Sequence, residues 1–302
     1  MHIKEMKEKI IMFGASSAGV TFIKKYQNEY EILAIADNDR KKHNTTLYNY
    51  LIIDPLQIKD YKYDYIVITS SFLLQIKDQL LKELKIDPLK IKALPKGGLY
   101  SSKSYRPFEH EKTMILAREI LLFIIEILAS EGIRYFVDHG TLLGLVRDGD
   151  IISWDDDIDF SIHSDDLEKV VMCMSRNIKK FPLSNELEWG AHLKYNQENK
   201  PCSITLSFDN NSKSDIKQFP ISITANYFVD GLAIQTVTYA PEDHFKQCEY
   251  IMYKGRKISV PYKYELYLEY HYGEWKQPKK DISFLDICNY QESNVRYQEI
   301  IF

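Results

Sequence analysis

Alternating strands and helices at the start of the chain constrain its fold more than any other feature. Residues 9–26 read KIIMFGASSAGVTFIKKY, an apolar run that ends at glycine and continues with apolar residues at helical spacing. Two further apolar runs follow in YEILAIADND and YDYIVITSS, and LLQIKDQLLKELKI again has helical spacing. Strands that alternate with helices predict a parallel sheet with crossovers, and therefore an α/β domain.

The glycine turn of this first unit departs from the usual dinucleotide-binding pattern. Gly14 and Gly19 flank Ser16, so the turn reads G-x-S-x-x-G and lacks the glycine that lets a backbone approach pyrophosphate. Asp37 lies near where a ribose-binding acid would sit. Roughly residues 1–90 resemble the short Rossmann-like domains attached to sugar-nucleotide enzymes. Nucleotide binding and a purely structural or docking role both stay open.

A change in composition predicts two domains. Residues 94–111, LPKGGLYSSKSYRPFEHE, are rich in Gly, Ser, Pro and charge, which is typical of a linker. We therefore expect a Rossmann-like domain over 1–105 and a second domain over 106–302. The second begins with a predicted core helix, EKTMILAREILLFIIEILASEGI, with Gly132 as its C-cap. From residue 188 onward we expect mostly strands, followed by a tyrosine-rich helix, KYELYLEYHYGEW.

Composition argues against several classes of protein. A formal net charge of −4 gives no general basic field, so nucleic-acid binding is not indicated. No C-x-x-C pair or H-x-x-x-H set occurs, which disfavours a zinc site. The charged N-terminus is unlike a signal peptide, and the apolar run at 120–125 is too short to span a bilayer. We expect a soluble, cytoplasmic protein without a transmembrane segment; a peripheral position at the inner membrane face and homo-oligomer formation stay open.

Four aspartates crowd five positions in the segment WDDDIDF, namely Asp155, Asp156, Asp157 and Asp159. With carboxylates about 7 Å apart and an effective dielectric near 20, each pair of charges costs roughly 2 kcal/mol. If the segment is a strand, its period of two places the three odd-numbered aspartates on one face and Asp156 on the other. Hard divalent cations such as Mg²⁺ prefer oxygen ligands and would offset this repulsion. A solvated acidic turn is one alternative; a calcium-binding EF-hand loop is another, but it needs glycine where Phe160 stands.

The surrounding sequence resembles a known family. A glycine-flanked turn, HGTLLG, precedes the acidic segment, which is the layout of the nucleotidyltransferase superfamily. The longer string YFVDHGTLLGLVRDGDIISWDDDIDF resembles the core motif of the LicD family, and YLEYHYGEWKQPKKD is similar to its closing segment. The resemblance spans roughly residues 108–285. It implies an α+β nucleotidyltransferase-fold catalytic domain.

The same resemblance implies an activity and its cofactor. Members of this family, which includes the relatives of fukutin and fukutin-related protein, transfer a phospho-alcohol such as phosphocholine or ribitol phosphate. The donor is a CDP-alcohol, the product is CMP, and the acceptor is a hydroxyl of a surface glycan or lipid-linked saccharide, as in capsule or lipopolysaccharide biosynthesis. Mg²⁺, or Mn²⁺ in its place, would be the cofactor. Which alcohol and which acceptor this chain uses are not predicted.

Five residues are implied to bind the donor. Carried over by position, Gly140 and Thr141 would hold donor phosphate, and Arg147 would contact the pyrophosphate. Lys194 is a further phosphate-neutralising residue, and His271 falls where related sequences often have arginine. For the three basic residues a structural role is the alternative, as a salt bridge, an exposed strand lysine or a buried histidine.

The metal ligands and the catalytic base are implied by the same positions. Asp157 and Asp159 would bind the metal ion, with Asp155 close by. The family's further acid on a later strand falls at Asn226 or Asp230, and the latter also qualifies as the start of a turn. The base that takes a proton from the acceptor hydroxyl would be Asp155 or Asp230.

Two other functions compete with this hypothesis. The same fold could transfer a nucleotidyl group, leaving NMP on a small molecule or a protein. A non-catalytic binding or scaffold protein is the second alternative. Retained metal-binding acids argue against the scaffold, because a protein without catalysis has no reason to keep their repulsion.

Overall fold

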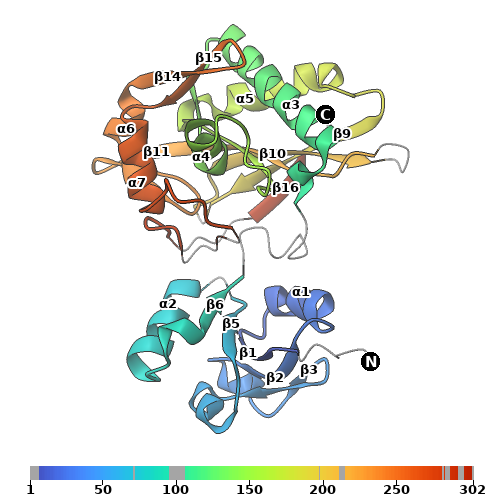
Figure 1. Cartoon of the computed structure of the whole chain (residues 1–302), viewed down its shortest axis with the longest axis vertical. Coiled ribbons are helices and arrows are strands. Elements are labelled where there is room, and N and C mark those ends of the chain that lie inside the picture. The colour runs from blue at the N-terminus through green and yellow to red at the C-terminus, as the bar shows by residue number, and fades with distance from the viewer. Residues whose placement is uncertain are drawn as a thin grey trace. The chain divides into compact units, whose positions relative to one another are not determined.

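The computed structural model describes residues 7–70, 72–94, 106–196, 198–210, 215–280, 282, 286–291 and 296–300. The chain divides into two compact units, each with its own sheet and apolar core (Figure 1). The first comprises Met1–Ser104 with Asp281–Asp286, and the second comprises Tyr105–Lys280 with Ile287–Phe302. Among the described helices, none is both long and apolar enough to cross a membrane.

The first unit is built on the predicted parallel sheet. Its strands are β1 (Lys9–Phe13), β2 (Glu31–Ala36), β3 (Thr46–Leu47), β4 (Tyr50–Ile53), β5 (Tyr65–Ile68) and β6 (Ile91–Ala93), in the order β3-β4-β2-β1-β5-β6. All neighbours are parallel except β3 and β4. The helices are α1 (Ser17–Tyr26) and α2 (Leu73–Asp78), and α2 continues into a π-helical turn, Gln79–Glu83. The predicted α/β alternation is confirmed.

The glycine turn after β1 is closely packed. Gly14 has φ +123°, and a Cβ there would meet the Thr69 carbonyl oxygen at 3.0 Å, so only glycine fits without strain. Asp37 accepts hydrogen bonds from the Ala15 N–H (2.8 Å) and from Lys42 Nζ (3.0 Å). Burial favours a higher pKa for Asp37, but its hydrogen bonds outweigh burial and lower the pKa. The Asp37 carboxylate, which lies near the position expected for a ribose-binding acid, therefore already has hydrogen-bond partners within the protein.

The second unit combines helices with a mainly antiparallel sheet. Its helices are α3 (Glu111–Ser130), α4 (His139–Arg147), α5 (Leu167–Asn177), α6 (Asp243–Lys246) and α7 (Tyr264–Tyr272). Its strands are β7 (Tyr135–Val137), β8 (Ile158–His163), β9 (Leu187–Tyr195), β10 (Pro201–Asn210), β11 (Ile221–Val229), β12 (Leu232–Ile234), β13 (Tyr239–Pro241), β14 (Cys248–Tyr253), β15 (Arg256–Pro261) and β16 (Arg296–Ile300). The main sheet runs β13-β12-β11-β10-β9-β16. Strand β8 joins this sheet by pairing with β11, and β7 pairs with β8. Strands β14 and β15 form a separate hairpin.

The centre of this sheet has one apolar and one polar face, because side chains alternate along each strand. On β8, Ile158, Phe160 and Ile162 are completely buried. The opposite face carries polar side chains that the register aligns in two rows. The first row contains Asp159, Ser222, Thr205 and His192, and the second contains Ser161, Thr224, Ser203 and Lys194. The polar face is where the acids of the motif meet the rest of the sheet.

Two predictions about the centre of the chain are wrong. The glycine-flanked segment after β7 is not a turn but helix α4, with Asp138 as its N-cap. The acidic segment is not a strand from Trp154 onward, since β8 begins only at Ile158. The residues before β8 form a loop in which the Asp155 N–H donates to the Ile152 carbonyl at 3.1 Å. Strand alternation therefore does not decide where the first three aspartates point.

Candidate functional site

The amino end of α4 is anchored on a buried carboxylate, Asp138. It accepts hydrogen bonds from the His139 N–H (2.8 Å), the Tyr267 hydroxyl (2.6 Å) and Gln235 Nε2 (2.9 Å). Burial alone would raise the pKa of Asp138. The positive charge that His139 carries when it is protonated and the hydrogen bonds from Tyr267 and Gln235 more than offset this and lower the pKa to about 2. The side chain is therefore ionised at neutral pH and holds the first turn of the helix in place.

The loop that contains Asp155, Asp156 and Asp157, here called the acidic loop, packs against this first turn. Among the described residues, Asp155, Asp156 and Asp157 form a group in which one carboxylate oxygen from each lies within 4.8 Å of the other two. A Cβ added to Gly140 would overlap Asp155 Oδ2, so the absence of a side chain at Gly140 lets the carboxylate lie directly on α4. The structure thus brings together Gly140, Asp155 and Asp157, and it adds Asp156, which strand alternation had placed on the opposite face.

Asp159 is tied to the same helix through its backbone. Its N–H donates to the Thr141 hydroxyl oxygen at 2.9 Å, and its carbonyl accepts from the Asp138 N–H at 3.0 Å. Thr141 is 1% exposed, so its hydroxyl joins α4 to β8 inside the protein. The Asp159 carboxylate lies on the polar face, two residues beyond Asp157, and is outside the group of three carboxylates. Phosphate binding by Thr141 stays a prediction.

Lys194 provides positive charge next to the acids. It lies on β9, on the polar face of the sheet, and is half-buried. Burial lowers the pKa of Lys194, while the carboxylates of Asp159 and Asp157 act in the opposite direction. The predicted donor-binding lysine is therefore close enough to both acids to interact with them electrostatically.

Arg147 and Asp230 are placed differently from the acids. Arg147 ends α4, makes two 2.8 Å hydrogen bonds to Asp148, and lies over the Trp154 ring at 5.7 Å from its centre.

Asp230 is exposed and has φ +50°, and Gly231 follows with φ +79°. Such a pair is the usual two-residue turn of a hairpin, here between β11 and β12. Asp230 therefore starts a turn and is not among the clustered acids.

The register between β8 and β11 decides which residue flanks Asp159. Ser222 pairs with Asp159, whereas Asn226 pairs with His163 at the far end of β8. Asn226 is 1% exposed, so it lies in the sheet interior and not beside the acidic loop. Sequence reasoning missed Ser222, because a serine in an alternating strand carries no signal until the register is known.

Sequence reasoning also missed a polar network at the amino end of α4. His139 Nε2 lies 2.8 Å from Gln235 Oε1, and His139 Nδ1 lies 3.2 Å from His271 Nε2. His271, a predicted donor-binding residue, is completely buried and contacts His139 inside the protein. Only His271 had been singled out from the sequence, because a lone glutamine or tyrosine gives no pattern.

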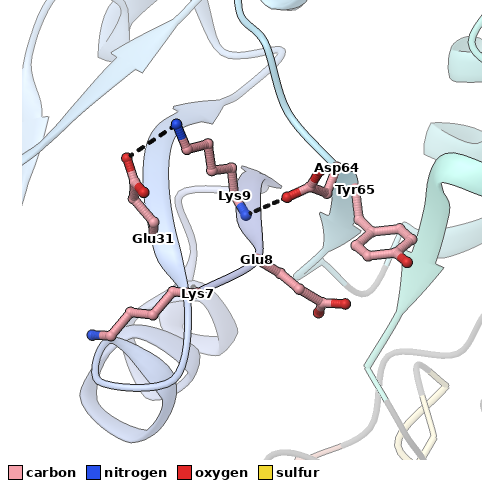
Figure 2. Close-up of a pocket in the computed structure, with 6 residues that line it drawn as sticks. All are labelled: Lys7, Glu8, Lys9, Glu31, Asp64 and Tyr65. Carbon is pink, nitrogen blue, oxygen red and sulfur yellow. Dashed lines mark hydrogen bonds and ion pairs between the residues drawn. The ribbon is translucent and has the colours of Figure 1, made fainter. Parts of the chain in front are cut away.

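A pocket of about 650 Å³ lies in the first unit, and its lining includes none of these groups (Figure 2). It is lined by Lys7, Glu8, Lys9, Glu31, Asp64 and Tyr65. Lys9, Glu31 and Tyr65 are the first residues of β1, β2 and β5, so the pocket is at the amino edge of the sheet. Open parallel sheets bind ligands at the carboxyl ends of their strands. The pocket is therefore a weaker candidate than the acidic loop.

Two segments of the chain match known protein families. Residues 132–263 match the family described as LicD/FKTN/FKRP, nucleotidyltransferase domain, and residues 6–92 match C2185-like, N-terminal. The chain is 42% identical over 50 residues to ribitol 5-phosphate transferase FKRP of Mus musculus and of Homo sapiens. That stretch covers 17% of this chain and only 10% of each relative.

Solved structures give weaker likenesses. UDP-D-quinovosamine 4-dehydrogenase from Vibrio fischeri is 26% identical, with 29% of this chain and 76% of that chain covered and a TM-score of 0.24. A myo-inositol dehydrogenase from Corynebacterium glutamicum is 10% identical, with 85% and 75% covered and a TM-score of 0.27. At these TM-scores the likeness supports no inference about function. The match to the LicD/FKTN/FKRP nucleotidyltransferase domain covers α4, the acidic loop and β8, so the part of the chain that holds the candidate site is similar to that domain.

Proposed function

We propose that the chain is a Mg²⁺-dependent transferase that moves a phospho-alcohol from a CDP-activated donor to a hydroxyl of a glycan, releasing CMP. The observation that carries this proposal is the acidic loop held against the first turn of α4, inside the family's nucleotidyltransferase domain. The relatives are named ribitol 5-phosphate transferases, which favours ribitol phosphate as the first group to test.

The residues present suit a hard divalent cation. Asp155, Asp156 and Asp157 offer only carboxylate oxygens, and Asp159 follows on the polar face of β8. We propose Asp157 and Asp159 as ligands of Mg²⁺ or Mn²⁺, with Asp155 as a further acid. When bound, such a cation neutralises charge on the transferring phosphoryl group.

The protein's own residues would do the rest of the work. The amino end of α4 presents backbone N–H groups and a positive dipole to the donor phosphates. Lys194 adds a basic group close enough to Asp157 and Asp159 to interact with them electrostatically. In the transfer, the acceptor oxygen bonds to the β-phosphorus while the bond from that phosphorus to the oxygen bridging the two phosphates breaks. CMP leaves with the electron pair, and we assign the acceptor's proton to Asp155.

The test measures CMP release from CDP-ribitol, CDP-choline and CDP-glycerol with Mg²⁺, with and without a glycan acceptor. Asp157→Asn should reduce release on the order of 100-fold, because the cation that neutralises phosphoryl charge is then held less tightly. Asp165→Asn, at a side chain that is 87% exposed, is the matched control. Full metal-dependent turnover by Asp157→Asn would show that the assignment is wrong.

By-product and binding assays address the competing functions. Pyrophosphate released from a nucleoside triphosphate, with NMP retained on an acceptor, would indicate nucleotidyl transfer instead. Absence of any CDP-dependent or metal-dependent thermal shift would indicate a non-catalytic protein.

A further inference from the structure

His139 is the first residue of α4 and has an unusual backbone conformation. Its φ of +46° lies in the left-handed region, which non-glycine residues adopt rarely. Such conformations persist where the surrounding structure holds them, and they gather at functional sites. The contacts of the imidazole show what holds His139 in place.

Both ring nitrogens of His139 are engaged inside the protein. Gln235 donates through Nε2 to Asp138 Oδ2 at 2.9 Å, so its Oε1 must act as an acceptor. His139 Nε2–H therefore donates to that oxygen at 2.8 Å. The other nitrogen, Nδ1, is then the acceptor for the Nε2–H of the buried His271 at 3.2 Å. This assignment follows from the hydrogen-bond partners, and it leaves the ring unsuited to act as a metal ligand or a base.

The residues that follow His139 reach the acids directly. Gly140 is the surface on which the Asp155 carboxylate lies, since any Cβ there would overlap Oδ2. Thr141 accepts the Asp159 N–H at 2.9 Å. A shift of the first turn of α4 therefore moves the supports of Asp155 and Asp159 together.

We propose that His139 is a positioning residue: held between Gln235 and His271, it fixes the first turn of α4 and thereby the arrangement of the acids that bind the metal ion. The inference rests on the proposed function, in which these acids bind Mg²⁺. It deepens that function by connecting the site to the buried network around Asp138.

The test titrates Mn²⁺ and follows the free ion by electron paramagnetic resonance. Glycine adopts positive φ without cost, so His139→Gly removes the ring and its contacts while the backbone conformation stays permitted. We expect about a tenfold weaker Mn²⁺ affinity, the effect usual for residues that orient metal ligands. CMP release should show a lower kcat. Lys254→Gly, at another left-handed position (φ +47°) in the β14–β15 turn, should change neither.

Two further variants separate positioning from a general loss of structure. His139→Asn keeps an acceptor in the place of Nδ1 and tolerates positive φ, so it should retain part of the affinity. Gln235→Met removes the contact at the other side of the ring and should reproduce the loss. In the double variant His139→Gly/Gln235→Met the losses should not add, because both act through one contact.

Unchanged Mn²⁺ affinity in His139→Gly would overturn the inference while leaving the proposed function intact. If the wild-type protein binds no Mn²⁺, the proposed metal centre fails instead. In that case, the rate of deuterium uptake by a peptide covering residues 153–159 tests without any metal whether His139 fixes the acidic loop. Uptake should rise in His139→Gly and stay unchanged in Lys254→Gly, and equal uptake in the wild type and His139→Gly would refute the role.

Discussion

Adding one methyl group to Gly140 is a sharp test of the site. An ideal Cβ there would lie 3.1 Å from Asp155 Cγ and closer still to Oδ2, whereas ordinary contacts begin at 3.4 Å. The carboxylate must therefore move by about 1 Å, and a misplacement of this size in a catalytic group costs on the order of 100-fold in rate. We expect Gly140→Ala to lower metal-dependent CMP release by roughly that factor and to weaken Mn²⁺ binding.

The same substitution should affect stability only modestly. The overlapping atoms belong to the end of a half-buried side chain on a loop, which can rotate away. Overpacking costs about 1–3 kcal/mol in a rigid core, and replacing glycine by alanine within a helix returns up to about 1 kcal/mol. Urea denaturation should therefore show a change in the free energy of unfolding of no more than about 2 kcal/mol.

Two matched glycine variants give this prediction its controls. In Gly144→Ala, on the same helix, the Cβ would meet the Asp150 carbonyl oxygen at 2.6 Å and the Ile152 nitrogen at 2.9 Å. Backbone atoms cannot rotate away, so this variant should lose more stability than Gly140→Ala. In Gly190→Ala nothing lies within 4 Å of the Cβ, so stability and activity should both stay unchanged. Wild-type CMP release and Mn²⁺ affinity in Gly140→Ala would refute the packing argument.

Three further predictions follow from charges in and near the site. Because the pKa of Asp138 is lowered from 3.8 to about 2, its stabilising effect is present above pH 3.8 and is lost as the pH falls through 2. As the pH falls from 3.8 to 2, the free energy of unfolding measured with urea should decrease by ~2 kcal/mol less in Asp138→Asn than in the wild type. An equal decrease in the two proteins would contradict this. Lys194→Met should raise the donor KM about 10-fold or more, through loss of a charge-assisted contact, without loss of stability, since burial already penalises the ammonium group. Asp230→Asn, in an exposed turn, should keep wild-type CMP release; a large loss would support Asp230 as the base.

Much of the fold could be predicted from the sequence, because strand and helix periods are local properties. The βα alternation of the first unit, helix α3 and the strands β9 to β13 and β15 follow from where apolar residues recur. The acidic segment misled the same reasoning. Its alternation of Asp and Ile resembles a strand, but hydrogen bonds within the loop and the contact with Gly140 hold Asp155 outside β8.

The sequence by itself determined the resemblance to the LicD domain and the residue types proposed for the site, since the LicD-like motif is a continuous string with its acids in a fixed order. Only the tertiary structure decided which residues meet. It placed Asp156 with Asp155 and Asp157, Ser222 beside Asp159, and His139 between two buried partners. The physical reason is that these neighbours depend on strand register and on packing between segments far apart in the chain, and local periodicity does not encode either.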